Sequence, residues 1–79
     1  MKQSFELHIC DTDWETRKPA DLLMSSSVDA ENYDAALKLA KAELKKMQKD
    51  YTRTWKQDQL EYGGSLPKPK LVITKLKVE

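Results

Sequence analysis

One apolar stripe in the middle of the sequence constrains the fold more than any other feature. Apolar side chains recur there at steps of three and four residues: Ala30, Tyr33, Leu37, Ala40, Leu44, Met47 and Tyr51. Such spacing places the side chains along one side of an α-helix. Asp29 is a suitable N-cap, and the lysines between residues 38 and 49 fall off the stripe. We therefore predict an amphipathic helix that begins near Asp29 and covers another layer.

The C-terminal end of this helix is ambiguous. No glycine or proline interrupts residues 51–62, so the helix could continue to Gly63, yet the composition from Tyr51 to Trp55 also suits a strand. A helix over residues 29–62 would be about 50 Å long at 1.5 Å per residue, which is excessive for so short a chain. We expect a break or kink near residues 50–54, followed by a second helix or a short strand.

Three segments read as strands, over residues 5–10, 21–28 and 70–78. Alternation places side chains two apart on the same face. The residues expected to share one side within their strands are Phe5, Leu7 and Ile9; Leu22, Met24 and Val28; and Val72, Leu76 and Val78. Leu71 and Ile73 are expected on the face away from the helix, together with Lys75 and Lys77.

These elements predict an α+β fold for residues 1–79 as a single small domain. The order is ββαβ, or ββαββ if residues 51–62 contain a strand. The sheet is antiparallel with three or four strands, one long helix packs on one face, and the strand order is 2-1-3. The predicted core is Phe5, Leu7, Ile9, Leu37, Ala40, Leu44 and Met47.

Few residues in the chain suit catalysis or metal binding. His8 and Cys10 are the only histidine and the only cysteine, so a metal site would lack further ligands of these types. A lone cysteine also rules out an internal disulfide, and the apolar runs are far too short to span a membrane. We expect a cytoplasmic protein that is not an enzyme and has no catalytic residue, cofactor or metal.

Charge is distributed unevenly along the chain. Residues 1–34 carry three basic and eight acidic side chains, a net charge of −5, and residues 35–79 carry eleven basic and five acidic ones, a net charge of +6. Such polarity can steer a partner toward one surface, although lysines on a helix and a strand also serve solubility.

Two observations point to binding of a macromolecule. Arg53, Trp55 and Lys56 combine positive charge with stacking surface, as single-stranded nucleic-acid sites do. Trp14 in a polar loop, with Leu71 and Ile73 on an uncovered strand face, indicates exposed apolar surface for a protein partner or a second copy. The candidate contact residues are Trp14, Arg53, Trp55, Lys56, Lys70, Leu71, Ile73, Lys75 and Lys77.

The resulting hypothesis is a small interaction module that binds a protein partner. Accessory regulators and inhibitors carried by phages and other mobile elements are often chains of this size. The alternative is a nucleic-acid-binding protein that uses the basic, aromatic C-terminal half. A homodimer is a further form to test, and no membrane contact is expected.

Overall fold

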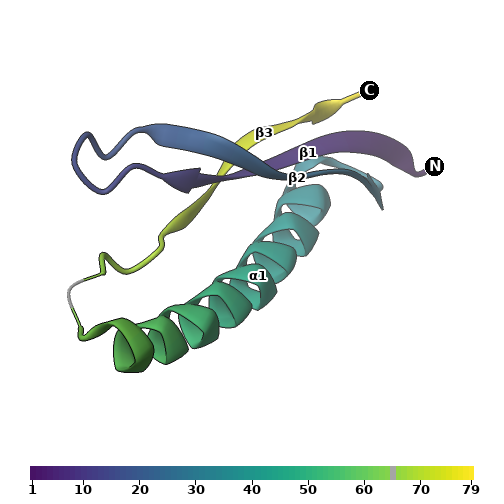
Figure 1. The fold of residues 1–79 in the computed structure, drawn as a ribbon. Coiled ribbons are helices and arrows are strands. Elements are labelled where there is room, and N and C mark those ends of the chain that lie inside the picture. Colours follow the sequence, from purple (N-terminus) through teal and green to yellow (C-terminus); the bar gives the residue numbers. More distant parts are fainter. Residues whose placement is uncertain (65) are drawn as a thin grey trace.

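The computed structural model describes residues 1–64 and 66–79, and it has two layers (Figure 1). The elements are strand β1 (Gln3–Thr12), strand β2 (Pro19–Ala30), helix α1 (Tyr33–Tyr62) and strand β3 (Leu71–Val78). The sheet is antiparallel with the order β2-β1-β3, and α1 packs against one face. The predicted α+β fold and strand order are confirmed, and the element order is ββαβ.

The core lies between the central strand and the helix. Alternation along β1 directs Phe5, Leu7 and Ile9 toward α1, and Leu7 and Ile9 have no exposed surface. Ala36 and Ala40 are fully buried because small side chains let the helix approach the sheet closely. The other predicted core positions are less deep: Leu44 and Met47 pack as half-buried side chains at its margin, and Ala36 rather than Leu37 takes the position beside Phe5.

A bulge in β3 reverses the predicted orientation of its first residues. The pairing with β1 proceeds from Lys75 directly to Ile73 and skips Thr74. One extra residue shifts the alternation, so the residues before it change face. Leu71 is therefore buried, Ile73 packs on the core, and Val72 lies on the face away from α1. The expectation that Leu71 and Ile73 face away from the helix is wrong.

A second irregularity changes the phase of β2. Its pairing with β1 passes from Met24 to Leu22, which leaves Leu23 as the extra residue. Leu23 and Met24 both pack on the core, whereas Leu22 is 54% exposed. The predicted common side of Leu22, Met24 and Val28 thus holds for Met24 and Val28 only.

The helix begins later than predicted. Asp29 belongs to β2, where its carboxylate accepts a hydrogen bond from the Ser4 hydroxyl at 2.8 Å. Asn32 is the N-cap, and its Oδ1 accepts the backbone N–H of Ala35 at 2.8 Å. Because β2 continues to Ala30, the helix begins only at Tyr33, directly after its N-cap Asn32.

The helix then runs without interruption through residues 50–54, so the expected break is wrong. Its 30 residues correspond to about 45 Å, and the longest dimension of the molecule is 51 Å. Gly63 ends the helix with a left-handed backbone conformation, φ 86°. Among the described residues, no helix has the length and apolar character needed to cross a membrane. The sequence predicts a loop over residues 63–69, because two glycines and two prolines lie there. Ser65 of this loop lies outside the described residues.

Candidate functional site

The hairpin between β1 and β2 presents a tryptophan. The Asp13 carboxylate accepts the backbone N–H groups of Thr16 at 3.0 Å and Glu15 at 2.8 Å, which fixes a tight turn. These two hydrogen bonds lower the pKa of Asp13 below its ordinary value of 3.8. Arg17 closes the turn with a left-handed backbone, φ 64°. Trp14 is held at the tip with 63% of its surface exposed.

Opposite the hairpin, the segment from Leu66 to Lys70 is fastened to α1 by side chains. The Leu66 carbonyl accepts the Trp55 indole N–H and the Gln59 amide, both at 2.9 Å, and the Leu66 N–H donates to Gln59 Oε1 at 3.3 Å. Nearer the sheet, Gln48 donates to the Pro69 carbonyl at 2.8 Å and accepts the Leu71 N–H at 2.8 Å. Hydrogen bonds from Gln48, Trp55 and Gln59 on one face of the helix thus hold the segment that returns to the sheet.

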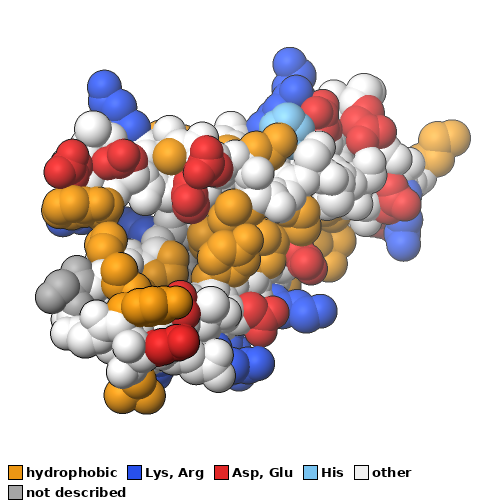
Figure 2. Space-filling view, viewed as in Figure 1, with side chains coloured by type: hydrophobic (Ala, Val, Ile, Leu, Met, Phe, Trp, Pro, Cys, Tyr) orange, Lys and Arg blue, Asp and Glu red, His pale blue; other side chains and the backbone are white. Residues whose placement is uncertain are grey.

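A cleft forms between the hairpin tip and the C-terminal half of α1. One hollow of about 500 Å³ lies between the hairpin and the returning segment, and a second of about 560 Å³ lies between that segment and the helix. Pro67 and Pro69 line both. Figure 2 shows apolar side chains on both sides of a recess at this end of the molecule. The first hollow is lined by Thr12, Asp13, Trp14, Arg17, Gln48, Pro67, Lys68, Pro69 and Lys70.

The two hollows differ in charge. Arg17, Lys68 and Lys70 outnumber Asp13 in the first, whereas the second contains Asp50 and Asp58 beside Tyr51 and Trp55. A partner that fills the cleft would therefore meet a basic wall near Trp14 and an acidic wall along the helix.

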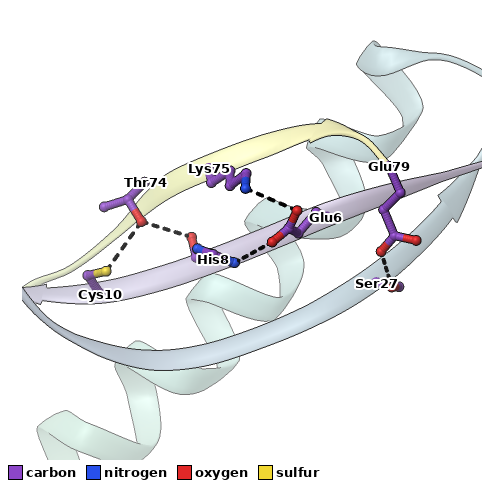
Figure 3. A network of polar contacts seen from close by, with 7 residues as sticks. All are labelled: Glu6, His8, Cys10, Ser27, Thr74, Lys75 and Glu79. Atoms are coloured by element: carbon purple, nitrogen blue, oxygen red, sulfur yellow. Dashed lines mark hydrogen bonds and ion pairs between the residues drawn. The ribbon is translucent and has the colours of Figure 1, made fainter.

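The sheet face away from α1 carries a polar network (Figure 3). The Glu6 carboxylate accepts His8 Nε2–H at 2.8 Å and receives Lys75 Nζ at 3.0 Å. The hydrogen bond from Lys75 is the main reason why the pKa of Glu6 is below its ordinary value of 4.5. Cys10 Sγ lies 3.2 Å from Thr74 Oγ1 rather than beside His8. Each group has a local partner, and this arrangement is typical of a structural network.

The structure places the candidate contact residues in different parts of the fold. Trp14 and Lys70 line the first hollow and Trp55 lines the second. Leu71 and Ile73 belong to the core. The other charged residues lie elsewhere: Arg53 and Lys56 are exposed on α1, and Lys75 and Lys77 pair with His8 and Glu6 in the sheet register.

Pro67, Pro69 and Gln48 line the cleft, but they are not among the candidate residues named from the sequence. Pro67 and Pro69 were assigned only to a loop, and Gln48 was not singled out. Two prolines in three residues are a recognisable signal, because they fix the backbone of the segment that carries them. The hydrogen bonds of Gln48 have no comparable signal, since its partners lie 21 and 23 residues away.

The outer side of α1 carries a basic stripe, which we define as the exposed residues Lys38, Lys41, Lys45, Lys46, Lys49, Arg53 and Lys56. Most of them recur at helical spacing, so they lie on one side of the helix. Arg53 Nη2 lies 3.7 Å from Asp50 Oδ1, an exposed pair that leaves the stripe strongly positive.

Among the described residues, no group of three His, Cys, Asp or Glu side chains is arranged to hold a metal ion. Comparison with protein-family models, curated proteins and solved structures gives no match.

Proposed function

We propose that this chain is a non-enzymatic interaction module, of the accessory regulator or inhibitor type, that binds a protein partner in the cleft. The observation that carries the proposal is the exposed Trp14 at the rim of a hollow lined by Pro67 and Pro69. Tryptophan is enriched among residues that dominate binding energy, because its large ring buries much surface with little loss of side-chain freedom.

The walls of the cleft are held in place before a partner arrives. Asp13 fixes the hairpin turn that carries Trp14, and Gln48 and Gln59 hold the proline segment against α1. Fixed walls reduce the conformational entropy lost on binding. Exposed Tyr51 and half-buried Trp55 add aromatic surface in the second hollow. These features support recognition of an extended apolar segment of a folded or unfolded partner.

Partner capture followed by binding kinetics tests this role. Wild-type chain is used to isolate partners from a nuclease-treated lysate, and one purified partner is then measured against variants. Trp14→Ala should weaken binding at least about tenfold, mainly through faster dissociation. Leu60→Ala is the matched control, because Leu60 is 90% exposed and lies outside both hollows. Equal affinities of the two variants for every partner would contradict the proposal.

Nucleic-acid binding is the second candidate, and the basic stripe is the observation that favours it. Seven exposed cations along about 27 Å of one side of the helix form a continuous positive surface that could neutralise several phosphates. Titration with single- and double-stranded oligonucleotides at low salt tests it. Changing Lys41, Lys45 and Lys49 together to Gln should reduce the affinity and the salt dependence, whereas Lys75→Gln and Lys77→Gln on the sheet should not.

A further inference from the structure

The outer edge of β2 is open and carries no charge along its centre. In the order β2-β1-β3, strand β2 has a neighbour on one side only. Its residues from Leu22 to Val28 are uncharged, while Asp21 and Asp29 flank them. Proteins usually guard an exposed edge with charges, because free backbone N–H and C=O groups pair readily with another strand. The opposite edge follows this rule, since β3 carries Lys75 and Lys77.

Apolar side chains lie beside this uncharged edge. Leu23, Met24 and Val28 are only half-buried although they pack on the core, and Leu22 is more than half exposed. Figure 2 shows apolar side chains gathered in the space between the sheet and α1. An added strand would therefore gain backbone hydrogen bonds and cover apolar surface at the same time.

Acidic side chains border the edge. Asp21 and Asp29 stand at its two ends. Near Asp29, the hollow beside Leu39 of α1 is balanced in charge, because Lys2 and Lys38 line it together with Asp29 and Glu31. The aspartates at the two ends of the strand favour a partner segment with basic residues at its ends.

We propose that β2 accepts an extended segment of another protein as an additional strand. The segment has alternating apolar side chains in its centre and Lys or Arg at its ends. A second copy of this chain fits less well: an antiparallel pair centred on Ser25 would place Asp21 of each copy opposite Asp29 of the other, and like charges in such positions destabilise the pair. This surface is separate from the cleft, so the inference stands independently of the function proposed above.

A designed peptide tests the inference on the full chain. The probe alternates Val and Thr over about seven residues and has two lysines at each end, and the same peptide with glutamates at its ends is the control. Amide hydrogen exchange should slow at least about tenfold at outward-facing positions of residues 22–28 with the lysine peptide. A lysine peptide N-methylated on alternate backbone nitrogens should not bind, because it cannot form the ladder.

Two protein variants separate this surface from the cleft. Asp21→Asn should weaken lysine-peptide binding by about two- to fivefold and reduce the preference over the glutamate peptide. Trp14→Ala should leave peptide binding unchanged. Protection centred on the cleft, no binding at millimolar peptide, or a free chain that is already a dimer with β2 protected would each overturn the inference.

Discussion

Replacing Gln48 with alanine tests the contact that joins the long helix to the last strand. The Gln48 amide donates to the Pro69 carbonyl and the Thr52 hydroxyl, at 2.8 and 3.1 Å, and accepts the Leu71 N–H. Leu71 is 4% exposed. Alanine at position 48 would leave the Leu71 N–H without its partner near the core, where an unsatisfied group costs about 1–3 kcal/mol. With the Pro69 carbonyl included, we expect a loss of about 2–4 kcal/mol in the free energy of unfolding.

Urea and thermal unfolding followed by circular dichroism measure this loss. For a domain of this size the expected fall in Tm is about 8–32 °C, from roughly 4–8 °C per kcal/mol. Gln57→Ala is the matched control, because it removes the same side chain from an exposed site on the same helix and should change stability by less than about 0.5 kcal/mol.

A third variant, Gln48→Glu, separates the hydrogen bond to the Pro69 carbonyl from the hydrogen bond with the Leu71 N–H. Its carboxylate keeps an acceptor for the Leu71 N–H but cannot donate to the Pro69 carbonyl, so its stability should lie between those of wild type and Gln48→Ala. Should Gln48→Ala unfold at the same urea concentration as Gln57→Ala, the fastening of the returning chain does not stabilise the fold and the reasoning is refuted.

Three further predictions concern stability. Leu7→Ala should cost about 2–5 kcal/mol in urea unfolding, whereas Leu60→Ala should be nearly neutral, because Leu7 is fully buried and Leu60 is 90% exposed. Asn32→Ala should cost about 1 kcal/mol by the same assay, since it removes the N-cap; an unchanged midpoint would argue against this helix start. The folded pKa of Glu6 is lowered, so its stabilisation is present above its ordinary value of 4.5 and is lost as the pH falls through the folded pKa. Glu6→Gln should therefore show a shallower fall in Tm below that pH than the wild type does. If the Tm of both proteins falls equally with pH, the ion pair of Glu6 with Lys75 does not stabilise the fold.

Strand alternation was enough to predict the central strand and the sheet order, because β1 is regular. Phe5, Leu7 and Ile9 face the helix as their spacing indicates. Alternation failed for the edge strands, because one extra residue, Leu23 in β2 or Thr74 in β3, moves the residues before it to the opposite face of the sheet. Neither position is a glycine, so no residue type marked the bulge in advance.

The helix end could not be predicted because distant residues decide it. Length alone favoured a break near residues 50–54, because an unbroken helix of about 50 Å is long for so short a chain. The stripe of apolar residues indeed gives way to polar ones, and Gln48, Trp55 and Gln59 bind the returning chain through hydrogen bonds. Tertiary contacts of this kind override local preference. Trp14, Trp55 and Lys70 of the cleft are among the candidate contact residues named from the sequence, and the exposure of Trp14 follows from its polar sequence context.

The small size of the fold determines which surfaces remain open for binding. In the part of the chain that the structure describes, one helix covers one face of a three-stranded sheet, and the other face and both edges are uncovered. The uncovered face holds Glu6 with its partners His8 and Lys75, and one edge carries lysines. The polar groups of that face therefore have hydrogen-bond partners within the chain, and the lysines disfavour pairing of the β3 edge with another strand. The β2 edge and the cleft beside Trp14 instead expose apolar side chains, and the β2 edge also has backbone groups that no neighbouring strand pairs. A second protein that covered these two surfaces would bury the most apolar area.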